Sequence, residues 1–316
     1  MPVINTHWVE GTKKYALKHS RLGNAIFKKF DKEYFMNHQL PDGPIEFRNS
    51  KGQSVNGSQL NKLFEQAVKQ ISAKKKPRGF KILKQRDFNW KLTSGLIILK
   101  SNDYPFVIKL FFENPKSFVC PFTKGFEQSI IFIMGEGINR FNVGFTRIKN
   151  LEVIKEKINS DPYWSKIIDF PRKWFWHPKN VKWFVVEGEN IGPERRERIE
   201  FPSIYAIVSD EIVVDENFEM YSKKNREMVI RLSTFLGNRM DPHINNFLRE
   251  KSTGKLVIID SEHFPSMVGL QKPLEYNNYF EWYAKLSLKC IDDYFLKYKK
   301  RRHEDQFKAK KEYLPI

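Results

Sequence analysis

Side chains with ligand oxygens gather in one short stretch of the sequence. Asp241 and Asn246 stand five residues apart in "DPHINN", and Asp260 follows fourteen residues after Asn246. Carboxylate and amide oxygens suit Mg²⁺, and phosphoryl transfer needs such a cation beside the phosphates. Alternatively, Asp241 caps a turn before Pro242 and the asparagines are turn formers. Each residue alone favours the turn, whereas the ordered set favours a metal–phosphate site.

The neighbouring sequence predicts the elements that must position these side chains. The stretch "NNFLREKSTGKLVIID" predicts two short strands around a Ser-Thr-Gly turn, with Asp260 directly after the second strand. Residues 216–236 carry apolar side chains at helical spacing, and Gly237 suits a C-terminal cap. Residues 276–313 are expected to form one or two long helices that end in a basic tail.

The upstream sequence predicts an antiparallel sheet. Three successive strands are expected at residues 79–92, 94–103 and 104–112, separated by Ser-Gly and Asn-Asp turns. A helix is expected over 123–137, and two more strands, 181–191 and 203–214, flank a charge-rich connection. Residues 1–78 are interpreted as a mostly helical N-terminal extension, because "SQLNKLFEQAVKQI" has helical spacing behind Ser58 and composition shifts at "SAKKKPRGF".

This order of elements and polar residues resembles the protein-kinase-like superfamily, over residues 79 to about 270. In that family the catalytic loop spaces an Asp and an Asn as D-x-x-x-x-N, and a second Asp follows a short hairpin. The resemblance implies an α+β, two-lobed fold. Residues 79–213 would form an N-lobe with a five-stranded antiparallel sheet and one inserted helix. Residues 214–316 would form a small, mainly helical C-lobe with a basic C-terminal helix.

The resemblance also implies roles for the oxygen-bearing residues. Asp241 would orient the attacking hydroxyl or accept its proton, while Asn246 and Asp260 would hold Mg²⁺ or Mn²⁺ beside ATP. Glu262 in "DSEHF" could add a carboxylate ligand, or it could lie at the surface or cap a turn. His243 is either a structural member of the loop or a catalytic group.

Further residues are assigned to the nucleotide by the same resemblance. Lys109 in "PFVIKL" matches the third-strand lysine, and Glu127 would be its partner, with Glu136 as the fallback. Ser209, Asp210 and Glu211 are assigned to cofactor binding. The alternative for Glu127 is an exposed helix position.

The sequence also departs from the family. The loop "KQRDFNWKL" has no glycine, so the phosphates would need other contacts, for which Lys81, Lys84, Arg86 and Lys91 are candidates. The sequence "NRMD" replaces H-R-D, and the part after Asp260 is too short for the helices of a full C-lobe. These departures indicate a minimal, divergent enzyme similar to atypical bacterial effector kinases, some of which use inositol polyphosphates as activators.

Composition limits the classes of partner and compartment. The 316 residues carry a net charge of +18, which predicts attraction to polyanions such as nucleic acid, nucleotides, inositol polyphosphates or an anionic membrane. The charge does not choose among them, and no specific nucleic acid is predicted. Two cysteines are too few for a disulfide framework or a cysteine zinc site. The N-terminus lacks the apolar core of a signal peptide, and no apolar run is long enough to span a membrane. We expect a cytoplasmic protein, with delivery to a host cell left open.

Three functions compete at this point. The first is an ATP- and Mg²⁺-dependent phosphotransferase whose acceptor is a protein or a phosphoinositide. The second is a pseudokinase, a nucleotide-binding scaffold without catalysis. The third is a basic protein that binds nucleic acid or a membrane surface through segments such as "KYKKRRHEDQFKAKK".

Overall fold

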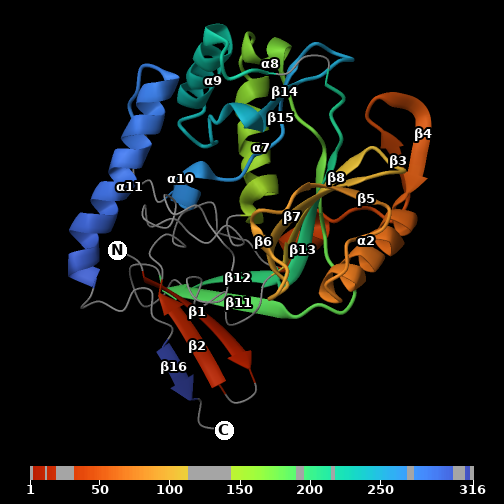
Figure 1. Ribbon diagram of the computed structural model, residues 1–316, viewed down its shortest axis with the longest axis vertical. Coiled ribbons are helices and arrows are strands. Elements are labelled where there is room, and N and C mark those ends of the chain that lie inside the picture. Colours follow the sequence, from red (N-terminus) through yellow and green to blue (C-terminus); the bar gives the residue numbers. More distant parts are fainter. Residues whose placement is uncertain are drawn as a thin grey trace. The chain divides into compact units, whose positions relative to one another are not determined.

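The computed structural model describes residues 3–10, 13–18, 32–112, 144–189, 196–214, 218–268, 274–301 and 310–313 (Figure 1). The described chain combines antiparallel sheets with helices, which confirms the predicted α+β class. It divides into two compact units, each built from separated segments. Unit 1 contains residues 1–127, 172–211 and 306–316, and unit 2 contains residues 128–171 and 212–305.

Most strands belong to unit 1. Its elements, in chain order, are β1 (Val3–Glu10), β2 (Lys13–Lys18), α1 (Lys32–Asn37), β3 (Pro44–Phe47), β4 (Ser50–Asn56), α2 (Gly57–Ser72), β5 (Phe80–Lys84), β6 (Phe88–Asn89), β7 (Ser94–Ser101), β8 (Phe106–Phe112), β10 (Lys173–Trp176), β11 (Trp183–Glu189), β12 (Arg196–Pro202), β13 (Ile204–Asp210) and β16 (Lys310–Tyr313).

Unit 2 carries the longer helices. Its elements are α7 (Thr146–Asn159), α8 (Trp164–Ile167), β9 (Ile168–Asp169), α9 (Lys223–Phe235), the 3-10 helix Ile244–Asn246, β14 (Phe247–Arg249), β15 (Leu256–Ile258), α10 (Phe264–Val268) and α11 (Tyr279–Arg301).

The central sheet of unit 1 differs from the predicted five strands. Four of the predicted strands are confirmed: β5, β7 and β8 pair in that order, and β13 pairs with β8, all antiparallel. The sheet has six strands, ordered β10-β13-β8-β7-β5 with β6 paired to β7. The predicted fourth strand, β11, pairs instead with β1 and β12 in a second sheet. We expected the charged residues of β12 to form a loop between the two predicted strands. In the sequence, however, these charges alternate with Ile199 and Phe201, as they do in a strand.

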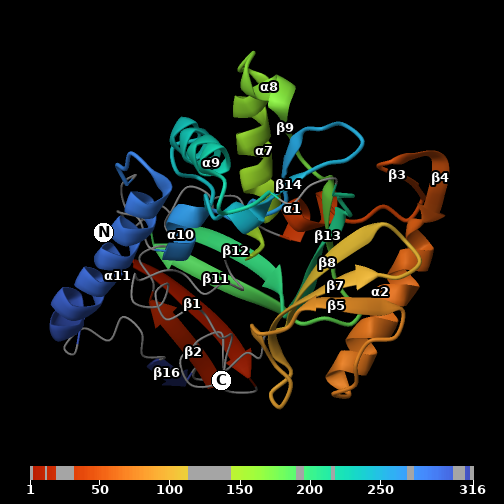
Figure 2. The ribbon, with the colours of Figure 1, turned by 45° about the horizontal axis from the view of Figure 1, so that its top comes forward.

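Helix α2 covers one face of the six-stranded sheet (Figure 2). Leu60, Phe64 and Ile71 lie on its buried side, in one apolar cluster with Leu99 and Ile108 of the sheet. The predicted helix is therefore confirmed, but its N-cap is Asn56, whose side chain accepts a hydrogen bond from the backbone N–H of Ser58. Residues 1–78 therefore differ from the mostly helical extension that was expected. They contain the four strands β1 to β4, and their helix α2 is part of the core of unit 1.

The predicted helix before the polar stretch begins later than expected. Its N-cap is Ser222, whose hydroxyl accepts a hydrogen bond from the backbone N–H of Asn225 at 3.3 Å. Tyr221 lies within the predicted span of this helix, but it precedes the cap and is 91% exposed. The helix ends as predicted, with Gly237 at φ +65°.

The predicted hairpin and C-terminal helix are both present. Strands β14 and β15 pair antiparallel with Phe247 opposite Ile258, and Gly254 adopts φ +67° in the turn. Strand β15 also pairs with β9 in parallel. One helix, α11, follows, whereas residues 310–313 form strand β16 beside β2. The predicted helix at 123–137 and residues 302–309 of the basic tail lie outside the described residues.

Candidate functional site

Helix α7 brings two polar side chains into the interior of unit 2. Ile148, Leu151 and Ile154 recur at helical spacing and are buried. Arg147 and Asn150 lie beside this apolar stripe and are 1% and 0% exposed. A buried guanidinium and a buried amide are costly unless they find partners. Both find them in the segments at the two ends of the polar stretch Asp241–Asp260.

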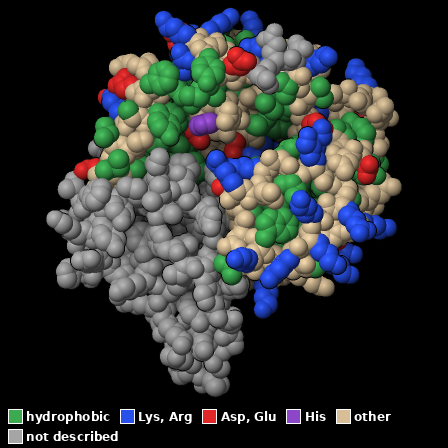
Figure 3. Space-filling view, viewed as in Figure 1, with side chains coloured by type: hydrophobic (Ala, Val, Ile, Leu, Met, Phe, Trp, Pro, Cys, Tyr) green, Lys and Arg blue, Asp and Glu red, His purple; other side chains and the backbone are tan. Residues whose placement is uncertain are grey.

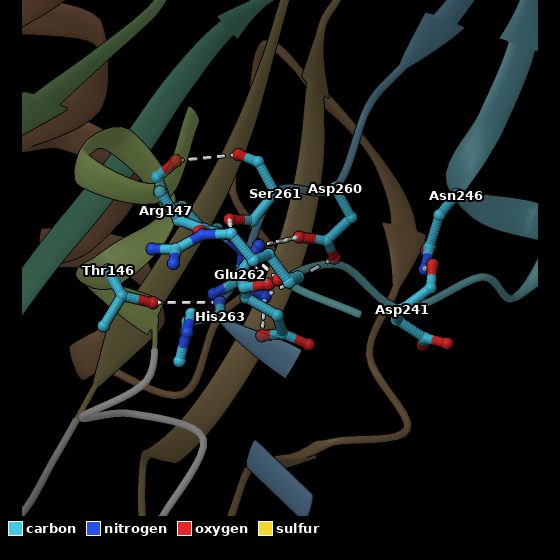
Figure 4. A network of polar contacts seen from close by, with 10 residues as sticks. Thr146, Arg147, Asp241, Asn246, Asp260, Ser261, Glu262 and His263 are labelled. Atoms are coloured by element: carbon cyan, nitrogen blue, oxygen red, sulfur yellow. Dashed lines mark hydrogen bonds and ion pairs between the residues drawn. The ribbon is translucent and has the colours of Figure 1, made fainter. Parts of the chain in front are cut away.

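Arg147 contacts the two carboxylates that follow β15 (Figure 4). Its Nε donates to Oδ1 of Asp260 at 2.9 Å, and its Nη2 lies 3.5 Å from Oδ2 of the same side chain. Nη2 also donates to Oε2 of Glu262, which is 3% exposed. The Asp260 side chain remains 16% exposed. One buried cation therefore holds two carboxylates, and Asp260 keeps part of its surface open.

Further hydrogen bonds fasten the segment after β15 to α7. The Ser261 hydroxyl donates to the carbonyl of Arg147 at 2.7 Å, and the His263 backbone N–H donates to Oγ1 of Thr146 at 3.1 Å. The amide nitrogen of Asn150 donates to the carbonyls of Arg239 and Ser261, both at 3.0 Å. Asn150 thus joins the segment before Asp241 to the segment after Asp260, which fixes the backbone on both sides of the candidate site.

Asp241 and Asn246 are joined by their own hydrogen bonds. The Asn246 amide nitrogen donates to the carbonyl of Asp241 at 3.2 Å, and the His243 backbone N–H donates to Oδ1 of Asp241 at 2.9 Å. The carbonyl of Asn246 accepts from the backbone N–H of Ile259 at 2.9 Å. Asn246 is therefore held at the base of the hairpin, next to the strand end that carries Asp260. The residues therefore form the turn at the base of the hairpin, and the metal–phosphate interpretation of the stretch stays a prediction.

His243 has a structural role in this loop. It is the N-cap of the 3-10 helix, and its Nδ1 accepts a hydrogen bond from the backbone N–H of Asn245 at 3.3 Å. This contact supports the interpretation of His243 as a structural member of the loop.

Burial controls the charge of the groups around the network. Burial, together with the positive charge of Arg239, lowers the pKa of His263 to about 3, so His263 is neutral at physiological pH. Burial raises the pKa of Tyr279 and of Tyr276, and the negative charge of Asp241 adds to both increases. Asp241 therefore stands close to two neutral phenols of the segment that leads into α11.

The residues assigned to nucleotide binding lie in unit 1. Lys109 is half-buried in β8 between Ile108 and Leu110, which face α2, so Lys109 faces the opposite side of the sheet. The Ser209 hydroxyl donates to the carbonyl of Val107 at 3.3 Å. Their assignment to a nucleotide stays a prediction.

The two acidic residues at the end of β13 form ion pairs. Arg172 donates to Oδ1 of Asp210 from Nη2 at 2.7 Å and to Oδ2 from Nε at 2.9 Å. Glu211 pairs with Lys100, and its backbone N–H donates to the carbonyl of Pro105. These contacts stabilise the end of strand β13. The assignment of Asp210 and Glu211 to a cofactor also stays a prediction. Glu127 and Glu136 lie outside the described residues.

Two side chains of the polar stretch could each offer an oxygen ligand to a cation. Among the described residues, no three His, Cys, Asp or Glu side chains form a cluster that could hold a metal ion. Mg²⁺ commonly takes one or two protein oxygens and completes its shell with water and phosphate. Asn246, whose nitrogen is committed to Asp241, can offer its amide oxygen, and Asp260 can offer a partly exposed carboxylate.

Comparison with known proteins does not assign the chain to a family. Neither models of protein families, nor curated proteins, nor solved structures gave a match to the chain. Among the helices that the structure describes, none has an apolar stretch of the length that a bilayer crossing requires.

Arg147, Asn150, Arg239 and His263 were not predicted as members of the site. The stretch "TRIKNLEVIKEKI" does show helical spacing of Ile148, Leu151 and Ile154, which could have revealed α7. If these residues form a helix, Arg147 and Asn150 lie beside its apolar face. No local pattern pairs these two residues with their partners, which stand more than eighty residues away in sequence.

Proposed function

We propose that the chain is an ATP- and Mg²⁺-dependent phosphotransferase of the protein-kinase-like type, with a protein or a phosphoinositide as acceptor. The observation that carries the proposal is the hydrogen-bonded pair of Asp241 and Asn246 at the base of the hairpin that ends at Asp260. Phosphoryl transfer requires mainly positioning and cations, and this arrangement fixes three oxygen-bearing side chains on one short structural element.

In this proposal Asp241 serves the acceptor. Its Oδ1 accepts the His243 N–H, which fixes the carboxylate plane, and the side chain is partly exposed. A carboxylate held in this way can orient an acceptor hydroxyl and receive its proton during transfer. The raised pKa values of the neighbouring Tyr276 and Tyr279 keep both phenols neutral, so they add no second negative charge beside Asp241.

Asn246 and Asp260 would hold the cation, and Glu262 would act through Arg147. Mg²⁺ would supply the positive charge that offsets the phosphate oxygens. The Glu262 carboxylate is buried against Arg147, so we propose that it positions the guanidinium. Arg147 in turn fixes Asp260 through Oδ1 at 2.9 Å, while Oδ2 lies farther away at 3.5 Å.

The test is transfer of labelled phosphate from ATP, with Mg²⁺ or Mn²⁺, to the protein itself, to generic protein acceptors and to phosphoinositides. We expect Asn246→Ala to lower the rate roughly 100-fold, because the variant loses a fixed oxygen ligand of the cation that would offset the phosphate charge. The matched control is Asn245→Ala, which removes the exposed amide of the preceding residue and should change the rate less than about twofold.

Equal rates for the two variants would sink the proposal. Stabilisation against heat by ATP and Mg²⁺ separates the remaining alternatives. Stabilisation that Asn246→Ala abolishes, with no transfer to any acceptor, would identify a nucleotide-binding scaffold instead. Assays with inositol polyphosphates added would show whether an activator is required.

A further inference from the structure

A basic run without counter-charges extends along one edge of unit 1. Residues 66–86 contain no Asp or Glu and the following eight basic residues: Lys69, Lys74, Lys75, Lys76, Arg78, Lys81, Lys84 and Arg86. The run covers the end of α2, the connector 73–79 and strand β5. We call this run, which includes Leu83, together with Lys91 and Leu92, the basic edge.

The backbone of the connector is fixed, so its charges are displayed at defined positions. The backbone N–H groups of Lys74 and Lys75 donate to the carbonyls of Ile71 and Gln70, both at 2.8 Å. The backbone N–H of Arg78 donates to the Gln70 side chain at 2.6 Å. The side chains of Lys74, Lys75, Lys76 and Arg78 are all exposed. Figure 3 shows Lys and Arg side chains gathered over the part of unit 1 that carries α2 and β5.

Little of this charge is neutralised within the protein. Asp87 pairs with Lys84 at 2.7 Å and lies 3.6 Å from Arg86. Within the described parts of the chain, the lysines of the connector make no ion pair. Concentrated exposed charge of one sign attracts a polyanion, and the attraction reaches about one Debye length from the surface, ~10 Å at ordinary salt.

Two leucines project beside these charges. Leu83 and Leu92 are 48% and 47% exposed. Leu83 lies where the register of β5 against β7 shifts between Ile82 and Lys84, and such an irregularity turns a side chain away from the regular pleat. Strand β5 is also the last strand of its sheet, so its outer side faces no further strand of that sheet.

The aliphatic character of the basic edge favours lipid over nucleic acid. Single-stranded nucleic acid is usually bound by aromatic rings that stack on bases. Trp90, which precedes Lys91, packs edge-on against Phe88 with 5.1 Å between ring centroids, and its N–H donates to Gln85 at 3.2 Å. By contrast, leucines among lysines and arginines are the combination with which proteins enter the interface of an anionic bilayer.

We propose that the basic edge binds the surface of an anionic membrane, with the lysines and arginines on the lipid phosphates and carboxylates and with Leu83 and Leu92 in the headgroup layer. Lysines on an edge strand also prevent strands of different molecules from pairing. If the lysines serve only to prevent such pairing, the protein should not bind lipid vesicles, so vesicle binding distinguishes the two roles. This inference does not depend on phosphoryl transfer.

The test is sedimentation of the full chain with vesicles of phosphatidylcholine alone or mixed with phosphatidylserine. We expect binding to the mixed vesicles that weakens with salt. Each lysine near an anionic surface contributes about 1 kcal/mol, so Lys74→Gln, Lys75→Gln and Lys76→Gln together should weaken binding roughly 100-fold. The variant Leu83→Ser with Leu92→Ser should weaken it by about tenfold and leave the salt dependence unchanged.

The matched control removes the same charge elsewhere. Lys223, Lys224 and Lys251 are exposed residues of unit 2, and their joint change to Gln should alter binding less than about threefold. Equal losses in the two triple variants would show that net charge alone acts, which overturns the proposal. Equal binding to both vesicle types would overturn it too, as would binding to RNA without binding to mixed vesicles.

Discussion

The interiors of the two units are built from different chemistry. In unit 1, α2 meets the six-stranded sheet through side chains such as Leu60, Phe64 and Leu99. In unit 2, α7 contributes apolar residues as well, but Arg147 and Asn150 are buried beside them and bind the backbone and carboxylates of distant segments. Apolar packing tolerates many substitutions of similar volume, whereas a buried ion pair requires particular partners. Unit 2 should therefore be the more sensitive of the two.

The largest effect is expected at Arg147. Arg147→Met keeps much of the side-chain volume but leaves Asp260 and Glu262 without the cation that they share. Loss of one partner from a buried ion pair costs about 3–5 kcal/mol in the free energy of unfolding. Urea unfolding would measure this loss, and hydrogen exchange would locate it in α7 and β15.

A second substitution tests the cause of that loss. If the uncompensated Glu262 charge is responsible, Glu262→Met in the Arg147→Met background should restore more than about 1 kcal/mol. A double variant no more stable than Arg147→Met would contradict this account and point to packing.

An intermediate effect is expected from pH. The pKa of His263 is about 3 in the folded protein because of burial, against 6.5 when exposed. The unfolded chain therefore binds a proton below about pH 6.5 that the folded chain excludes, so stability falls as the pH falls. Between pH 7 and pH 5 this group alone should remove about 2 kcal/mol. The measurement is the difference in unfolding free energy between wild type and His263→Gln at both pH values; parallel curves would refute the assignment.

The smallest effect is expected in the apolar core of unit 1. Leu60→Met conserves the volume of a fully buried side chain of α2 and should cost less than about 1.5 kcal/mol. Thermal or urea unfolding would give the value. A cost as large as that of Arg147→Met would remove the contrast between the two interiors.

The same contrast explains what could be predicted from the sequence. Strands β5, β7 and β8, helices α2, α9 and α11 and the β14–β15 hairpin follow local apolar periodicity and turn residues, and they were predicted. Asp241, Asn246 and Asp260 were also singled out together, because their spacing is short enough to be visible along the chain.

What could not be predicted depends on contacts that no local pattern records. Arg147 reaches Asp260 and Glu262 across 113 and 115 residues of sequence. From the sequence, β11 was expected in the same sheet as β13, but its partners are β1 and β12. In each case the choice among compatible strands or charges is made by the tertiary fold, which periodicity does not specify.

The interleaving of the two units affects how the chain can be made and divided. Strand β8 ends at Phe112, but its sheet partner β13 begins only at Ile204, after the α7 segment of unit 2. At a synthesis rate of about 5–20 residues per second, the edge of β8 waits roughly 5 to 20 s for β13. During that time an apolar strand is open to incorrect pairing. No single cut separates the units either, so expression of one continuous half of the chain would yield neither of them intact.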